Sequence, residues 1–120
     1  MILTQSLQKP DAERILRQVP FDHGFHFTEN GKYTGVTAAS LEEFASKLET
    51  IDIHSVDFHY PRGDFQKWIE DTLGDRELAD RMCYIKPDVS GEKLRAQLLR
   101  IVQKRLTELK SLKWTETKGI

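Results

Sequence analysis

The residues of this sequence best suited to chemistry are two histidines and the polar side chains near them. A predicted sheet combines a hairpin with a strand at residues 55–60, and its outer face gathers His26, Tyr33, Asp57 and His59. Two imidazoles and a carboxylate on one face could bind a divalent metal ion or shuttle a proton. The alternative is an ordinary solvated sheet face. Because no close spacing such as His-x-x-x-His occurs, we treat these four as candidate ligand-binding residues and predict no metal site.

A further candidate ligand-binding residue is Arg62, which lies between the predicted strand and the helix that follows. Open α/β sheets often bind ligands at such a junction, and the free N–H groups of a helix N-terminus favour anions. Arg62 and His59 add positive charge there. However, Asp64 is predicted to cap the helix, and its carboxylate repels an anion. The alternative is that Arg62 pairs with a carboxylate while Gly63 permits the turn.

Motifs of known catalytic chemistry are absent from the sequence. Cys83, the only cysteine, lies beside Met82 on the apolar side of a predicted helix, so we expect a buried structural thiol. A catalytic thiolate needs exposure and a lowered pKa, and nothing nearby in the sequence supplies either. The sequence has no Gly-rich phosphate loop, no Gly-x-Ser-x-Gly and no His-Glu-x-x-His. We therefore predict no catalytic residue and no cofactor.

The last predicted helix carries a basic face and one unusual cation. Lys93, Arg100 and Lys104 project from one side, opposite a stripe of leucines. This side is a candidate surface for a polyanion or an acidic partner, and the alternative is a solvated helix face. Arg105 instead falls inside the apolar stripe. We expect it to be partly buried and to contact a carboxylate from residues 1–85 or from a second subunit.

Composition places the chain among small globular domains. It has 120 residues, of which 38% are hydrophobic and 31% charged, and a formal net charge of −1, which argues against a generally basic nucleic-acid binder. No apolar run reaches the roughly 20 residues that span a bilayer, and the start is too polar for a signal peptide. Together with the single cysteine, this predicts a cytoplasmic protein.

Charge is unevenly distributed along the chain. Residues 1–85 hold nine basic and fifteen acidic residues, whereas residues 86–120 hold nine basic and four acidic residues. Such a split indicates that the C-terminal part packs on acidic surfaces or exchanges between them.

The clearest local signal is Asn30-Gly31, which lies between two β-rich runs and predicts a two-residue type I′ hairpin turn. Four pairs are then predicted to face each other: Glu29 with Lys32, Phe27 with Thr34, Phe25 with Val36, and His23 with Ala38. Alternation places the residues at odd positions from Phe21 to Phe27 on one, largely apolar face.

Capping residues and apolar periodicity predict the remaining elements. Helices are predicted to begin near Pro10, Ser40, Asp64, Asp75 and Ser90, and the alternating stretch at residues 55–60 is predicted to be a strand. A strand, a helix and a strand in this order favour a right-handed βαβ crossover. The predicted fold is α+β, a β-hairpin extended by a third strand and packed against four to five helices. A single globular domain is predicted over residues 1–112, with a frayed tail over residues 113–120.

Several stretches together resemble a family. They are Tyr33-Thr34-Gly35, residues 40–44, residues 58–69, Leu73-Gly74-Asp75 and Leu78-Ala79. In order and spacing they resemble a small prokaryotic, mainly archaeal, family of domains of unknown function, over residues 10–110. The resemblance implies a stand-alone cytoplasmic domain, and it implies no activity, ligand or catalytic residue.

The predicted function is a small non-enzymatic binding or regulatory module of unknown ligand, which acts with a protein partner or by self-association and without a membrane. One alternative is a metal- or anion-dependent enzyme or sensor that uses His26, Asp57, His59 and Arg62. If these side chains cluster within about 5 Å around a cleft, the enzyme or sensor is favoured, and if they scatter, the module is favoured. A third, less favoured class is a nucleic-acid accessory protein that acts through the basic last helix.

Overall fold

The computed structural model describes residues 7–115, which form an α+β fold of six α-helices and one two-stranded antiparallel sheet. The strands are β1 (Phe25–Glu29) and β2 (Lys32–Ala38). The helices are α1 (Lys9–Leu16), α2 (Leu41–Thr50), α3 (Ile53–Arg62), α4 (Asp64–Trp68), α5 (Arg76–Met82) and α6 (Gly91–Thr115). A 3-10 turn at Phe21–His23 precedes β1, and a π-helical turn at Ile69–Leu73 continues α4.

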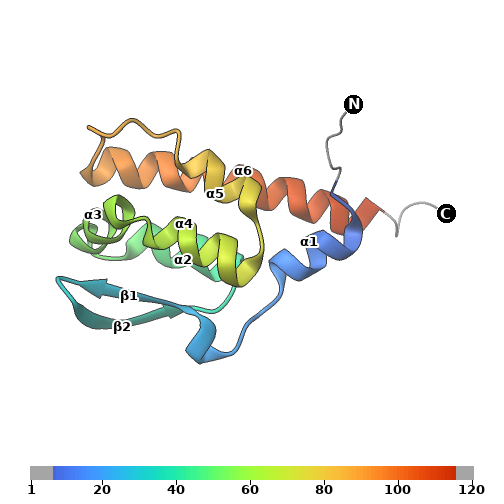
Figure 1. The fold of residues 1–120 in the computed structure, drawn as a ribbon, viewed down its shortest axis with the longest axis horizontal. Coiled ribbons are helices and arrows are strands. Elements are labelled where there is room, and N and C mark those ends of the chain that lie inside the picture. Colours follow the sequence, from blue (N-terminus) through green and yellow to red (C-terminus); the bar gives the residue numbers. More distant parts are fainter. Residues whose placement is uncertain (1–6, 116–120) are drawn as a thin grey trace.

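Helix α6 runs along one side of the molecule, and the hairpin lies on the opposite side (Figure 1). Helices α1, α2, α3 and α5 all contact α6. Helix α3 also packs on β1 and α2 packs on β2, so the helices cover one face of the hairpin. Among residues 7–115, no helix combines the length and the apolar character that crossing a membrane requires.

The predicted hairpin is confirmed, and so is the predicted pairing of Glu29 with Lys32 beside the turn, but the register beyond that pair is wrong. Asn30 and Gly31 have φ of 53° and 84°, as a type I′ turn requires. Beyond the turn, a bulge at Thr34 and Gly35 shifts the pairing by two residues. Phe25 therefore faces Ala38 and Phe27 faces Val36. Because the shift is an even number, Phe25 and Phe27 stay on the buried face.

The pair predicted farthest from the turn fails because one of its residues lies outside the hairpin. His23 belongs to the 3-10 turn and not to β1, so its predicted pairing with Ala38 is wrong. Phe21, which was expected on the apolar face, is 65% exposed.

The predicted third strand at residues 55–60 is wrong, because these residues belong to α3. Ser55, Val56 and His59 are buried, which is helical spacing. Asp52 caps the helix by accepting a hydrogen bond from the N–H of His54 at 2.8 Å. A short β-rich run is compatible with both the two-residue period of a strand and the 3.6-residue period of a helix. Here the segment packs on β1 and α6, and this tertiary packing favours the helix. The described chain consequently contains no βαβ crossover.

Most of the predicted helix boundaries are confirmed. The Ser40 hydroxyl caps α2 by accepting a hydrogen bond from the Glu43 N–H at 3.1 Å. The Glu43 carboxylate in turn accepts a hydrogen bond from the backbone N–H of Ala39. Asp75 caps α5 through its side chain. Gly74 has φ of 84° and ends the π-helical turn in a left-handed conformation that glycine adopts at low cost.

The core lies between the hairpin and α6. Its aromatic centre comprises Phe25, Phe27, Phe44, Phe65 and Trp68. The predicted stripe of the last helix is confirmed, because Leu94, Leu98, Val102 and Leu109 are all buried. Of the tail predicted over residues 113–120, residues 113–115 continue α6 and residues 116–120 lie outside the described part of the chain.

Candidate functional site

His26 and Tyr33 lie on the outer face of the hairpin, as predicted. The hydroxyl oxygen of Thr37 lies 2.8 Å from Nδ1 of His26 and 2.6 Å from the hydroxyl of Tyr33. The two rings are nearly perpendicular at 5.8 Å, and the exposed ring of Phe21 lies 5.2 Å from that of His26. These side chains form an aromatic group with no carboxylate in it.

His59 lies in the core and not on the sheet face. Its Nε2 accepts a hydrogen bond from the Thr28 N–H at 2.9 Å, so the proton is on Nδ1, which lies 2.9 Å from Asp64 Oδ2. Burial lowers the pKa of His59 and outweighs the hydrogen bond and charge of Asp64, which raise it. With both nitrogens occupied, the ring holds the hairpin to α3.

Asp64 does not cap α4, which corrects the prediction; Gly63 occupies that position in a left-handed conformation. The Asp64 carboxylate instead accepts hydrogen bonds from His59 and from Arg62 Nε, the latter at 2.9 Å. Burial raises the pKa of Asp64, but these two hydrogen bonds outweigh it and hold the pKa below its ordinary value. The Arg62 guanidinium also stacks on the Phe58 ring at 4.7 Å. The Asp64 carboxylate therefore already partners both His59 and Arg62 at this corner.

Asp57 and Tyr60 hold the chain segment that joins α5 to α6. Asp57 Oδ1 accepts a hydrogen bond from the N–H of Gly91 at 2.8 Å. One turn further along α3, the Tyr60 hydroxyl donates to the carbonyl of Met82 at 2.7 Å. The segment 83–90 is thus tethered to one helix at both of its ends.

A pocket of about 370 Å³ lies between this segment, the end of α3 and α4. It is lined by Tyr60, Pro61, Gly63, Gln66, Cys83, Ile85, Pro87 and Val89. Small-molecule sites are concave, have volumes of roughly 300–1,000 Å³, and combine apolar walls with a few polar groups. The pocket meets all of these conditions.

The three polar side chains of the pocket are in different states. The Tyr60 hydroxyl is engaged by Met82, and burial together with the neighbouring Cys83 raises its pKa. Cys83 is exposed, so its predicted burial is wrong; α5 ends at Met82, and the helical spacing that predicted burial ends with it. The side-chain oxygen of Gln66 is buried and has no hydrogen-bond partner, the only such side-chain atom in the described part of the chain.

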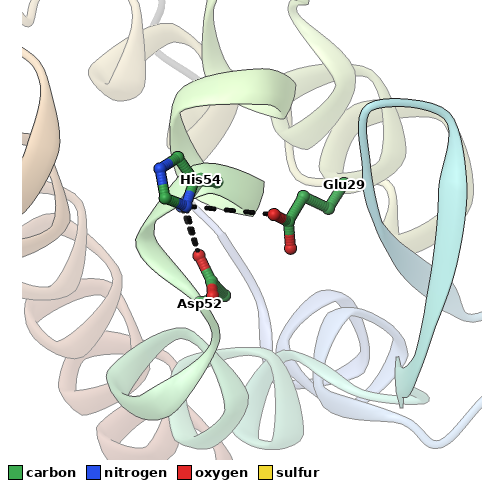
Figure 2. A group of neighbouring side chains, drawn as sticks. All are labelled: Glu29, Asp52 and His54. Atoms are coloured by element: carbon green, nitrogen blue, oxygen red, sulfur yellow. Dashed lines mark hydrogen bonds and ion pairs between the residues drawn. The ribbon is translucent and has the colours of Figure 1, made fainter.

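A second group of polar residues lies where the hairpin turn meets the start of α3 (Figure 2). His54 Nδ1 lies 2.8 Å from Asp52 Oδ1 and 3.9 Å from Glu29 Oε2, and all three donor atoms lie within 4.8 Å of one another. Such atoms can ligate a divalent cation. However, the residues are largely exposed, and the capping of α3 by Asp52 already accounts for the contact between Asp52 and His54.

The three predicted cations of the basic surface do lie together on the outer face of α6. Lys93, Arg100 and Lys104 are exposed, and none of them makes an ion pair or hydrogen bond with another residue of the described chain. By contrast, the neighbouring Arg95 pairs with Glu92, and Lys110 pairs with Glu42 across to α2.

A small α+β domain with an open pocket at the α3–α4 corner, among several surface pockets, is thus the class that fold and geometry define. The chain belongs to DUF5752, a family of unknown function, whose model matches residues 60–119. The resemblance to a family of unknown function is thereby confirmed for this half of the chain. Neither a curated protein nor a solved structure matches the chain. The family match includes every residue that lines the pocket and none of Glu29, Asp52 and His54.

The sequence alone predicted neither the pocket nor the group formed by Glu29, Asp52 and His54. Gln66 lies off the apolar stripe of its helix, so nothing in the sequence distinguishes it from a solvated glutamine. The pair Asp52 and His54 has a visible spacing, but Glu29 joins them only because residues 53–62 are helical. The one sequence feature that relates to the pocket is the proline-containing segment between the last two helices. In the sequence this segment looks like an ordinary connection between helices.

Proposed function

We propose that this protein is a non-catalytic binding module that receives an apolar group in the pocket between α3, α4 and residues 83–89. The observation that carries the proposal is a preformed hollow of ligand size whose walls are largely apolar. Its outer wall, the segment 83–90, is tethered at both ends, so the hollow exists before any ligand arrives. A preorganised site of this kind binds without the cost of ordering its own loop.

Scattering of the predicted reactive residues supports a module over an enzyme. His26 lies on the outer hairpin face, Asp57 binds the start of α6, and His59 has both ring nitrogens occupied in the core. An acid–base or metal mechanism needs several such groups around one cleft. None of these three residues lines the pocket.

The test is a titration of the protein with toluene, followed by amide NMR. We expect shifts at Ile85 and Val89. Val89→Trp fills the pocket and should abolish the response, whereas Ala96→Trp on the outer face of α6 should preserve it. Shifts elsewhere in the molecule, or an unchanged response in Val89→Trp, would contradict the proposal. So would the absence of any response.

We also propose a second candidate, in which the outer face of α6 binds an acidic segment of a partner protein. The observation that favours it is that Lys93, Arg100 and Lys104 are exposed and unpaired on one stripe of the described helix. Three cations are fewer than the roughly six to ten phosphate contacts of strong DNA binders, which favours a peptide over a nucleic acid. Two copies packed through this same face would bring like charges together.

Polyglutamate is the probe for this second candidate, and single-stranded DNA is its competitor. We expect salt-sensitive binding of polyglutamate that is lost when all three residues are changed to Glu. The matched control changes Lys32, Lys67 and Lys86 to Glu, which alters net charge equally and should retain more binding. Tighter binding of the DNA, or equal losses in both triple variants, would overturn the candidate.

A further inference from the structure

We propose that Glu29, Asp52 and His54 form a binding site for a divalent transition-metal ion such as Zn²⁺, at the corner where the hairpin meets α3 (Figure 2). The site lies apart from the pocket of the proposed function, since none of its residues lines that pocket. Its ligand atoms come from two elements, because Glu29 ends β1 whereas Asp52 and His54 stand at the start of α3. A bound ion would therefore join the hairpin to α3.

The ring of His54 presents one nitrogen to both carboxylates. Its Nδ1 lies 2.8 Å from Oδ1 of Asp52 and 3.9 Å from Oε2 of Glu29, and the three ligand atoms all lie within 4.8 Å of one another. Zn²⁺ holds such atoms at about 2.0–2.2 Å in a tetrahedron, which places them about 3.3–3.6 Å apart. The observed separations lie on both sides of this value. The side chains can adjust by rotation, since their exposed fractions range from 36% for Glu29 to 72% for His54.

The capping of α3 explains only part of this arrangement. Asp52 caps the helix by accepting the backbone N–H of His54, and this hydrogen bond does not involve the imidazole. Glu29 takes no part in the cap and reaches the group from the hairpin. Neither carboxylate forms an ion pair with a lysine or arginine among residues 7–115. Two carboxylates thus converge on one imidazole, and a divalent cation would neutralise them.

The same corner offers room for the rest of a coordination shell. A hollow of about 490 Å³ lies between the hairpin and the end of α2, and Glu29 and Asp52 line it. Three protein ligands leave at least one position for water. Lys47 also lines the hollow, and the charge of Arg95 acts on Asp52, so these two cations weaken the site without pairing with its carboxylates. An imidazole ligand favours Zn²⁺ over Mg²⁺, which prefers oxygen ligands alone.

Calorimetric titration of the full chain with Zn²⁺, and separately with Mg²⁺, tests the proposal. We expect one Zn²⁺ to bind per chain and Mg²⁺ to bind much more weakly. Cys83→Ser removes an exposed thiol that could hold Zn²⁺ by itself, and it should leave the result unchanged. Zn²⁺ should also raise the temperature of thermal unfolding, because it binds the folded arrangement of hairpin and helix.

Matched variants assign the ligands. His54→Gln and Glu29→Gln should each weaken Zn²⁺ binding at least about tenfold, a loss that removal of an outer-shell partner alone often causes. Their controls are His23→Gln and Glu49→Gln, which change exposed residues outside the group and should leave the affinity unaltered. Asp52→Asn keeps an acceptor for the helix cap, so weaker Zn²⁺ binding in this variant is expected without loss of the fold.

Three results would overturn the proposal. The first is no binding of Zn²⁺, and the second is an affinity for Mg²⁺ equal to that for Zn²⁺, which would leave the imidazole without a role. The third is unchanged Zn²⁺ affinity in His54→Gln or a loss of binding in Cys83→Ser, either of which would place the ion elsewhere in the protein.

Discussion

At the scale of single residues, the protonation of the His59 ring is coupled to the stability of the fold. The ring accepts a hydrogen bond from Thr28 through Nε2 and binds Asp64 through Nδ1. A second proton would convert Nε2 into a donor that faces the N–H of Thr28. Burial, the largest effect on the pKa of His59, opposes that proton, the carboxylate of Asp64 favours it, and Arg62 opposes it.

Stability should therefore fall on mild acidification. An unfolded chain takes up the histidine proton near the ordinary pKa of 6.5, whereas the folded protein does so only at lower pH. Between these values the unfolded state binds more protons, so the stabilisation is complete above pH 6.5 and declines below it. Urea unfolding between about pH 7.5 and about pH 5.5 measures this decline.

The matched variants locate the effect. His59→Gln should flatten the dependence on pH, whereas His26→Gln, on the outer hairpin face, should leave it in place. A wild-type unfolding free energy that stays constant across this range would contradict the assignment of His59 as a neutral buried ring.

Arg105 is the second residue at which charge is buried. Its guanidinium makes two hydrogen bonds to Asp75, at 2.8 and 2.9 Å, and one to Glu108 at 3.1 Å. The exposed fractions are 4% for Arg105 and 1% for Asp75. The prediction that this arginine contacts a carboxylate from residues 1–85 is confirmed. The contact could be predicted from the sequence because helical spacing places Arg105 among leucines that are buried.

Arg105→Met should destabilise the protein by about 3 kcal/mol or more, because it leaves the buried carboxylate of Asp75 without its partner. Lys110→Met removes an exposed ion pair with Glu42 and should cost less than about 1 kcal/mol. Chemical denaturation of both variants compares them directly. Similar small losses would mean that the Asp75 carboxylate finds other partners in the folded state.

At the scale of elements, the hairpin shows what a local sequence can determine. The turn was predictable because Asn30 and Gly31 both adopt positive φ at low cost. The bulge at Thr34 was not, since it depends on the Thr34 hydroxyl, which donates to the carbonyl of Phe27 at 2.8 Å. The backbone of Thr28 turns instead to Ser55 and His59 of α3.

Gly31→Val should destabilise the hairpin by roughly 1–2 kcal/mol through backbone strain. Gly31 has φ of 84°, and a Cβ there would meet no atom within 4 Å, so no steric clash complicates the result. Gly31→Asn is the control, because asparagine tolerates this conformation and should cost clearly less. Equal losses in the two variants, measured by thermal unfolding, would contradict the type I′ turn.

The same element scale explains why residues 55–60 were mispredicted. Val56, Phe58 and Tyr60 alternate as in a strand, but Ser55, Val56 and His59 are the residues that become buried. Burial of a serine and a histidine carries no hydrophobic signal in the sequence. It depends on the backbone of Thr28, which both side chains bind. The candidate pocket was hidden for a related reason, since its wall depends on tethers from Asp57 and Tyr60 of this helix.

At the scale of the whole molecule, the uneven charge becomes a packing arrangement. The basic C-terminal helix α6 pairs with acidic groups of the first part of the chain, through Arg105 with Asp75 and Lys110 with Glu42. Arg95 also donates to the carbonyls of Leu48 and Ile51 at the end of α2. The uneven charge distribution predicted that the basic C-terminal part packs on the acidic first part of the chain. It did not predict which residues form the ion pairs.

Helix α6 is therefore the element on which the other helices assemble, and its loss should abolish the native state. A chain that ends at Ile85 lacks the leucine stripe that α1, α2, α3 and α5 contact. A domain of this size has little apolar area to spare, so the truncated chain should be insoluble or molten, with exposed apolar surface and no cooperative transition. Dye binding and chemical denaturation measure both properties.

A milder version of this test keeps the whole chain. Leu98→Ala removes a fully buried side chain in the first half of α6 and should cost about 2–5 kcal/mol. Gln103→Ala, on the exposed face of the same helix, should change the unfolding free energy by less than about 0.5 kcal/mol. If the truncated chain unfolds cooperatively and Leu98→Ala is nearly neutral, α6 is an appendage of a smaller fold. Its apolar stripe would then be free for a partner.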